Sequence, residues 1–134
     1  MTEQVLIPSL FEEDYILRSL GSIVNQPDTA LTELVANAWD AGATCVEIHI
    51  PEDYQQKLTI QDNGTGMTED EFQNRWMKLR YNRSLSQGRK VVFPNGATSN
   101  RTAFGRNGVG RHGLFCFGDN YTVTTSKDGK SHRF

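Results

Sequence analysis

Cysteines and long apolar runs are scarce in this sequence. Its 134 residues contain two cysteines, Cys45 and Cys116, which are too few for a disulfide framework or, by themselves, for a zinc site. Because both have apolar neighbours, we expect buried, reduced thiols. No stretch approaches the roughly 20 apolar residues of a membrane helix, and residues 1–4 lack the basic and apolar regions of a secretory signal. We therefore expect a single cytoplasmic domain without a membrane partner.

The formal net charge of −2 conceals an uneven distribution. Residues 1–74 carry fourteen acidic and two basic side chains, whereas residues 75–111 carry nine basic side chains and no acidic one. We call residues 75–111 the basic block. Such a block inside an acidic chain indicates either an anionic partner, including a nucleic acid, or a solvated loop. Charge alone leaves both readings open.

Apolar spacing predicts one clear helix, which Pro27 opens and Gly42 closes. Asp28 or Thr29 is the expected N-cap. The apolar side chains of this helix recur at the helical period and form a buried stripe: Ala30, Leu31, Leu34, Val35, Ala38 and Ala41. A shorter helix is expected over residues 13–20.

Alternating apolar residues predict two strands, over residues 45–50 and 57–61, which a turn at residues 51–53 joins as a hairpin. Thr68 and Glu71 form a capping box before another helix. The side chains expected on the buried face of that helix are Phe72, Trp76 and Leu79.

Periodicity is lost over residues 81–104, which we expect to be one long functional loop. A short helix over residues 108–118 and a strand over residues 121–125 should follow. Asp128-Gly129 is a hairpin turn signal. Because the chain ends five residues after Gly129, we expect an N-terminal fragment of a longer protein.

The predicted helix over residues 27–42 carries three polar residues, Glu33, Asn37 and Asp40, at positions i, i+4 and i+7. They share one side of the helix, next to the apolar stripe. A carboxylate and an amide one turn apart can orient a water molecule and ligate Mg²⁺. The alternative is an exposed polar edge stabilised by a local hydrogen bond.

A second polar segment, Asp62-Asn63-Gly64-Thr65-Gly66-Met67, directly follows a predicted strand. A carboxylate at a strand end can accept a hydrogen bond from an exocyclic amine. Glycines allow the backbone to approach a ligand closely, and Met67 can pack on a flat ring. The alternative is an ordinary glycine-rich turn.

The third segment is glycine-rich and runs from Gly105 to Gly113. Its G-x-G-x-x-G spacing is not a dinucleotide fingerprint, because a polar loop precedes it and Arg133 occupies the position of the acidic residue. It is not a P-loop either, because Arg111-His112 replaces Lys-Ser/Thr. Glycine-rich backbone that opens a helix still attracts phosphate. His112 is expected in a solvent-facing turn, with a phosphate contact as the alternative.

Together, in this order and spacing, the three segments resemble the nucleotide-binding motifs of the GHKL superfamily of Bergerat-fold ATPases. That superfamily includes DNA gyrase B, the heat-shock-90 chaperones, histidine kinases and MutL proteins. The resemblance spans about residues 28–118 and is closest to the hydrolysing MutL or heat-shock-90-like branch. It implies an α/β two-layer sandwich, with helices on one face of a mixed, mostly antiparallel sheet. It also implies that residues 81–104 are the ATP lid.

The resemblance also implies roles for individual residues. Glu33 would activate the attacking water, Asn37 would ligate Mg²⁺, and Asp40 would lie near the adenine in a water network. Asp62 would accept a hydrogen bond from the adenine amine, beside Gly64, Gly66 and Met67. The segment expected to close over the phosphates consists of Gly105, Arg106, Asn107, Gly108, Val109 and Gly110.

The implied activity is Mg²⁺-dependent ATP binding with slow hydrolysis to ADP and phosphate. The implied partners are ATP and ADP, a second copy of the chain in an ATP-dependent homodimer, and C-terminal domains of the same protein. Later strands, with a Thr-type hydroxyl near the adenine, are expected beyond Phe134. Two alternatives are an ATP-binding switch without turnover and a nucleic-acid-binding module that uses the basic block.

Overall fold

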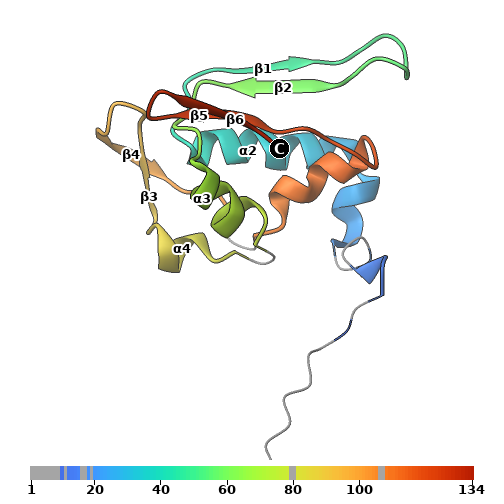
Figure 1. The fold of residues 1–134 in the computed structure, drawn as a ribbon, viewed down its shortest axis with the longest axis horizontal. Coiled ribbons are helices and arrows are strands. Elements are labelled where there is room, and N and C mark those ends of the chain that lie inside the picture. Colours follow the sequence, from blue (N-terminus) through green and yellow to red (C-terminus); the bar gives the residue numbers. More distant parts are fainter. Residues whose placement is uncertain (1–9, 11, 16–17, 19, 79–80, 106–107) are drawn as a thin grey trace, which may run out of the picture.

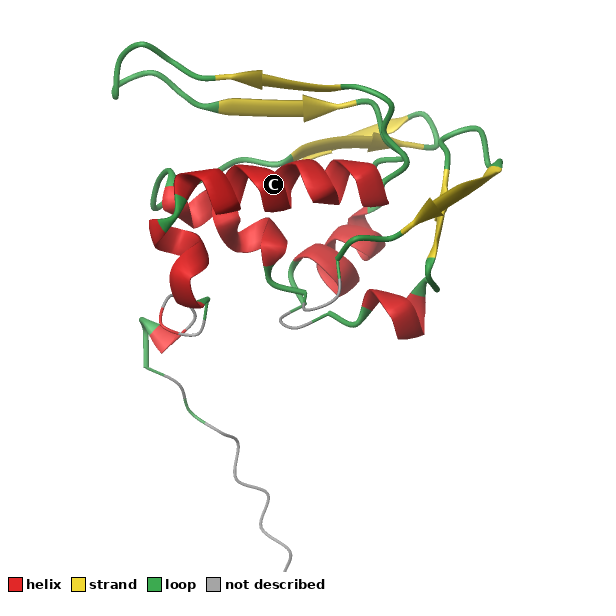
Figure 2. Ribbon diagram, turned by 180° about the vertical axis from the view of Figure 1, so that it is seen from behind, coloured by secondary structure: helices red, strands yellow, loops and turns green. Residues whose placement is uncertain are grey.

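The computed structural model describes residues 10, 12–15, 18, 20–78, 81–105 and 108–134. They form a mixed α/β arrangement in which helices gather on one side of two strand hairpins (Figures 1 and 2). The central helix is α2 (Pro27–Asp40), and η1 (Gly21–Asn25) and η3 (Gly110–Cys116) pack against it. No helix in the described ranges is long and apolar enough to cross a membrane.

The strands of the described residues form three separate antiparallel pairs. The pairs are β1 (Val46–His49) with β2 (Thr59–Asp62), β3 (Lys90–Val92) with β4 (Thr98–Thr102), and β5 (Thr124–Lys127) with β6 (Lys130–Arg133). The first and third pairs confirm the two predicted hairpins. The expected single sheet is not formed among these residues, because each strand pairs only with the other strand of its own hairpin.

Helix α2 agrees in part with the predicted apolar stripe: Ala30, Leu34 and Ala38 are buried, whereas Val35 is exposed. The predicted N-cap was wrong. Gln26 holds that position, and no side chain caps the helix. The Thr29 hydroxyl, which could have served as a cap, instead donates to the Gln26 side chain at 3.1 Å. Pro27 at the first helical position lowers the need for a cap, because it brings no N–H.

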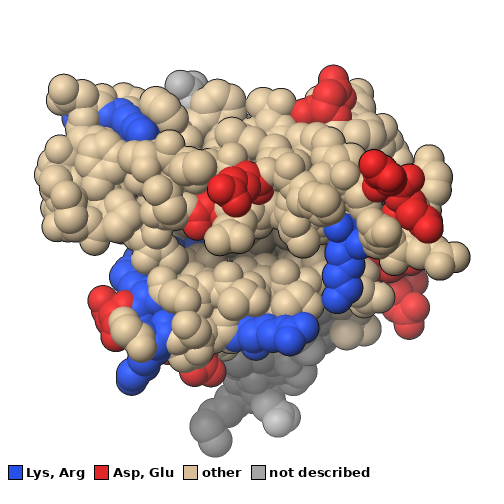
Figure 3. Space-filling model, turned by 90° about the horizontal axis from the view of Figure 1, so that it is seen from above, with Lys and Arg blue, Asp and Glu red and all other residues tan. Residues whose placement is uncertain are grey.

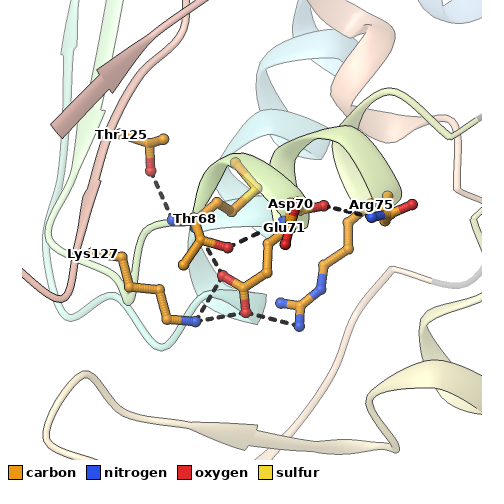
Figure 4. Close-up of polar contacts among 8 residues, drawn as sticks. Thr68, Asp70, Glu71, Arg75, Thr125 and Lys127 are labelled. Carbon is orange, nitrogen blue, oxygen red and sulfur yellow. Dashed lines mark hydrogen bonds and ion pairs between the residues drawn. The ribbon is translucent and has the colours of Figure 1, made fainter. Parts of the chain in front are cut away.

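The predicted capping box is confirmed at the start of α3 (Glu69–Glu71), as Figure 4 shows. The helix continues as a π-helical turn, η2 (Phe72–Trp76), in which Phe72 is buried as expected. The expected buried residue Leu79 lies outside the described residues. Lys127 of β5 binds both oxygens of the Glu71 carboxylate at 2.7 and 2.8 Å, which fastens the third hairpin to α3.

The Glu71 carboxylate is therefore an electrostatic anchor. Burial by itself would raise its pKa, but the Lys127 hydrogen bond, the Thr68 N–H and the Arg75 charge together lower that pKa below the ordinary value. Arg75 lies 3.0 Å away and completes the ion pairs.

The segment of residues 81–104 is not the irregular loop that the sequence suggested. It contains a short helix, α4 (Arg83–Ser86), and the β3–β4 hairpin. β3 has three residues and a register shift, too little for alternation to appear in the sequence. The hairpin rests on the end of α2, where a Cβ at Gly42 would overlap the carbonyl oxygen of Val92. Contacts from distant residues therefore impose this structure.

Two further predictions concern the burial of the cysteines and the helix over residues 13–20. Cys45 is exposed, against the expected burial, and Cys116 is half-buried. The apolar neighbours of Cys45 belong to β1, a strand whose side chains are mostly exposed. The helix expected over residues 13–20 falls partly on residues 16, 17 and 19, which lie outside the described residues.

A glycine comparison tests the contact between Gly66 and β5. Gly66 has φ +65°, and a Cβ there would overlap the Ser126 carbonyl oxygen, whereas Gly88 has φ +77° and open space around it. We expect Gly88→Ala to cost about 1 kcal/mol through its backbone conformation alone. Gly66→Ala should cost about 1–3 kcal/mol more, because the backbone must also move apart. Urea unfolding measures both, and equal losses would contradict this packing.

Candidate functional site

The glycine-rich segment runs antiparallel to α2, along the side that carries the three predicted polar residues. Ideal Cβ atoms built on Gly105 and Gly110 would lie 3.0 Å from Asp40 Oδ2 and 2.5 Å from Glu33 Oε2. Further along, Gly113 would meet Ala30 at 3.2 Å. A side chain at any of these positions would require its neighbour to move, and at Gly110 it would displace the Glu33 carboxylate. The structure thus brings the first and third predicted motifs together.

Asn37 lies between these contacts and has an unsatisfied amide. Its Nδ2 is buried and has no hydrogen-bond partner among the described residues. A buried amide without a partner is costly and marks a position where a ligand can bind. Because the amide oxygen and nitrogen are assigned from their hydrogen bonds, either atom can face such a ligand. A metal coordinated by this amide, with phosphate and water as its other ligands, fits this donor set.

Asp40 is occupied by contacts with the segment that precedes Gly105. Its carboxylate accepts hydrogen bonds from the N–H groups of Phe104 and Gly105, at 2.6 and 2.8 Å. Arg83 lies 3.8 Å from the same carboxylate. The sequence had suggested the adenine edge for Asp40, and these protein contacts were not foreseen.

The second predicted motif is built onto the end of α2. Asp62, the last residue of β2, accepts a hydrogen bond from the Gly64 N–H at 2.8 Å, and its side chain is exposed. The Thr65 N–H donates to the Ala41 carbonyl at 2.8 Å, and a Cβ on Gly64 would lie 2.8 Å from Ala41. The turn after β2 therefore lies next to the helix that carries Glu33 and Asn37.

Thr125 supports this turn from the other side, and sequence reasoning missed it. Its hydroxyl accepts a hydrogen bond from the Met67 N–H at 2.8 Å, and the residue is only 8% exposed. Figure 4 shows the contact. The family resemblance had implied a hydroxyl of this type only beyond Phe134. The alternation of Tyr121, Val123 and Thr125 was visible in the sequence, but it did not show which element this strand would face.

An open cleft of about 570 Å³ adjoins these motifs. The residues that line it include Asp40 and Thr65 from the motifs, Arg83 from α4, and the turn between β5 and β6. Glu33 and Asn37 do not line it. The cleft therefore opens toward the residue 81–104 segment and the second motif, and the Glu33–Gly110 contact lies outside it.

Most described side chains of the basic block serve the fold. Arg75 and Arg83 are ion-paired with carboxylates. Arg101 donates to the Ala43 carbonyl at 2.5 Å and stacks 4.2 Å from the Trp39 ring centre. On the face seen from above, Lys and Arg atoms form separate patches with acidic groups between them (Figure 3). These contacts do not favour the reading of the block as a nucleic-acid surface. Arg80 and Arg106 lie outside the described residues.

Arg111 ties the glycine-rich segment to η2. Its guanidinium donates to the carbonyl oxygens of Trp76, Lys78 and Gly108, and the residue is 7% exposed. Burial lowers its pKa. Gly108 and Val109 stand at the start of η3, and both are half-buried. The two other residues assigned to this segment, Arg106 and Asn107, lie outside the described residues.

His112 is buried, against the expected solvent-facing turn. It is 6% exposed, and neither ring nitrogen has a hydrogen-bond partner among the described residues. Burial, followed by the neighbouring Arg111 charge, lowers its pKa from 6.5 to about 4. The ring stacks near Phe115, with 6.3 Å between the ring centres. His112 is thus a neutral packing residue at neutral pH.

A family model described as "Histidine kinase-, DNA gyrase B-, and HSP90-like ATPase" matches residues 25–133. Its span covers all three motifs and each of the elements that position them.

Individual relatives are similar over shorter stretches. A provisional type II restriction enzyme, HgiDII of Herpetosiphon aurantiacus, is 33% identical over 102 residues, which cover 76% of this chain and 15% of that protein. The DNA mismatch repair protein MutL of Shewanella woodyi is 39% identical over 72 residues, 54% of this chain and 11% of that protein. MutL of Xanthomonas axonopodis is 47% identical over 52 residues, with coverages of 39% and 8%. The chain therefore matches no more than 15% of the length of any of these three relatives.

The pKa of His112 gives a prediction for stability against pH. The unfolded chain takes up a proton near the ordinary value of 6.5 and the folded chain only near 4, so stability should fall as the pH drops between these values. His112→Phe should flatten that part of the melting-temperature profile. The exposed-residue control His49→Gln should keep the wild-type slope. Identical slopes for all three proteins would show that His112 titrates normally.

Proposed function

Because this chain belongs to the histidine kinase-, DNA gyrase B- and HSP90-like ATPase family, we propose that it binds ATP with Mg²⁺ and hydrolyses ATP slowly. The observation that carries this proposal is the antiparallel path of the glycine-rich segment along α2. That path places flexible, donor-rich backbone opposite Glu33, Asn37 and Asp40. Backbone N–H groups without side chains in the way suit a triphosphate.

The proposed nucleotide lies between α2, the turn after β2 and the glycine-rich segment. Asp62 receives the adenine amine, with Gly64 and Gly66 allowing close approach and Met67 packing on the ring. Among the described residues of the glycine-rich segment, the N–H groups proposed to contact the phosphates are those of Gly105, Gly108, Val109 and Gly110. Asp62 keeps one carboxylate oxygen for the Gly64 N–H, so its other oxygen remains to accept from the base.

Asn37 is the proposed protein ligand of Mg²⁺, which neutralises phosphate charge when bound. The described residues contain no cluster of three or more His, Cys, Asp or Glu side chains able to hold a metal. The site therefore suits a cation that arrives with the nucleotide and takes most of its ligands from phosphate and water. Asn37 would ligate the cation through its amide oxygen, and its unpartnered Nδ2 would remain to donate to a phosphate oxygen.

Glu33 is the proposed general base. It stands one helical turn before Asn37 on the same side of α2. Its carboxylate takes a proton from the attacking water, whose oxygen bonds to the γ-phosphorus as the bond to the ADP oxygen breaks. The products are ADP and inorganic phosphate. Residues 81–104 are the proposed lid. In a longer protein, lid movement would be coupled to dimerisation or to a neighbouring domain of the same chain.

Glu33→Gln should separate binding from turnover. The amide keeps the size of the side chain but cannot accept the water proton, so hydrolysis should fall by about 10²–10⁴-fold. Affinity for ATP, measured by calorimetry with Mg²⁺, should stay within about threefold, because the base contributes little to ground-state binding. The matched control is Glu47→Gln, which alters an exposed strand residue.

Undiminished turnover in Glu33→Gln would contradict the assignment of the base. If the wild-type protein binds ATP but shows no turnover, the chain is an ATP-binding switch.

Asp62→Asn tests the adenine contact. An asparagine can still accept a hydrogen bond from the Gly64 N–H through its amide oxygen. Its NH₂ group would then oppose the adenine amine, and two donors cannot form a hydrogen bond with each other. We expect the affinity for ATP to fall by about 10- to 100-fold, the cost of an unmatched donor. Affinity for GTP, which presents a carbonyl at that position, should fall less. The control Asp119→Asn changes an exposed carboxylate elsewhere, and equal ATP affinities in all three proteins would rule out this contact.

A further inference from the structure

Both ends of the residue 81–104 segment meet at one side chain, Asp40 at the end of α2. At the far end of the segment, the N–H groups of Phe104 and Gly105 donate to the Asp40 carboxylate at 2.6 and 2.8 Å. At the near end, Arg83 approaches the same carboxylate at 3.8 Å and donates to the Asp40 backbone carbonyl at 2.9 Å. A single carboxylate therefore closes the segment into a loop.

The hairpin between these ends has an attachment of its own. Trp39, next to Asp40 in α2, donates from its indole nitrogen to the Thr102 carbonyl at 3.1 Å. Arg101 lies over the Trp39 ring and 5.0 Å from the centre of the Phe93 ring. The last turn of α2 thus holds the hairpin through aromatic and backbone contacts, whereas charge holds the two ends.

The contact between Asp40 and Arg83 is buried, which holds the segment in place, but not all of its polar atoms have hydrogen-bond partners, which favours its opening. Asp40 and Arg83 have side chains that are only 11% and 13% exposed, so removing one would leave the other buried without its partner. Arg83 Nη1 is itself buried without a hydrogen-bond partner among the described residues. A buried guanidinium nitrogen without a partner lowers the net stability of the contact. When the contact opens, water can hydrogen-bond to this nitrogen, and that bond offsets part of the free energy needed for opening.

Opening matters because the fastened segment leads into the glycine-rich backbone, which lies close to α2 at Gly105 and Gly110. With Gly110 backed against Glu33, where a Cβ would be 2.5 Å from the carboxylate, no phosphate group fits between the two. Gly105, the last described residue before Gly108, is held by Asp40. Release of Asp40 is therefore the local change that frees the start of the glycine-rich segment at Gly105, whereas Arg111 continues to hold the Gly108 carbonyl.

We propose that Asp40 and Arg83 are positioning residues that fasten both ends of the lid to α2, and that their contact must open for a nucleotide to enter or leave. The gating part rests on the proposed ATP binding. Asp40 then acts through the lid backbone, in addition to any contact with the nucleotide. Breaking the contact should speed both entry and exit, since both pass through the same opening.

Hydrogen exchange tests the fastening without any nucleotide. In Arg83→Gln the amide exchange of Phe104 and Gly105 should rise about tenfold, because their acceptor loses its charged partner. Arg83→Lys keeps the charge but not the forked geometry, and should give a smaller rise. The control Arg89→Gln changes an exposed side chain in the same segment and should leave both amides as in the wild type.

The double variant Asp40→Asn/Arg83→Gln should exchange no faster than the faster single variant, because both changes break one contact. Unchanged exchange in Arg83→Gln, or additive effects in the double variant, would overturn the fastening.

Stopped-flow kinetics with a fluorescent ATP analogue and Mg²⁺ test the gating. For Arg83→Gln we expect association and dissociation rates each to rise about five- to tenfold, so that the affinity changes by less than about threefold. A faster dissociation with an unchanged association rate would instead make Arg83 a direct nucleotide contact and overturn the gate. Absence of binding by the folded wild-type protein would contradict the proposed function, while the exchange experiment would still decide the fastening.

Discussion

Backbone lying directly on helix α2 is the contact on which the rest of this site depends. Along the helix, glycines without side chains lie where side chains usually pack against one another, and a Cβ at these positions would require a neighbouring group to move. The contacts pair Gly113 with Ala30, Gly110 with Glu33, Gly105 with Asp40 and Gly64 with Ala41. Because the backbones are so close, N–H groups from two distant segments come within reach of the polar side of one helix.

The uneven charge of the sequence finds an explanation in the same arrangement. The acidic half of the chain supplies Asp40 and Glu71, and the basic block supplies Arg83 and Arg75 as their partners. Lys127 adds a second cation at Glu71. Within the basic block, Arg83 thus helps attach the lid to α2 and Arg75 pairs along its own helical segment, whereas Lys127, outside the block, attaches the third hairpin. A polar cleft between these attachments remains open to solvent.

Elements with strong local signals could be predicted from the sequence. The apolar stripe of α2, the alternation in β1 and β2, the capping box at Thr68 and the Asp128-Gly129 turn all appear in the structure. The β3–β4 hairpin could not be predicted, because its strands are short and its support comes from Trp39 and Gly42. The N-cap of α2 was missed because a proline at the first helical position takes the place of a capping side chain.

The sequence by itself determined which chemical groups are present and in which order: the Glu33–Asn37–Asp40 spacing, the Asp62 turn and the glycine-rich run. That information is local, and it sufficed to identify the ATPase family. Tertiary structure alone decided how the groups are used. It joined Asp40 to residues 43, 64 and 65 positions away, buried His112 beside Arg111, and set Thr125 behind Met67. Hydrogen bonds and burial of this kind depend on distances between segments remote in the chain, and no local pattern of residues encodes those distances.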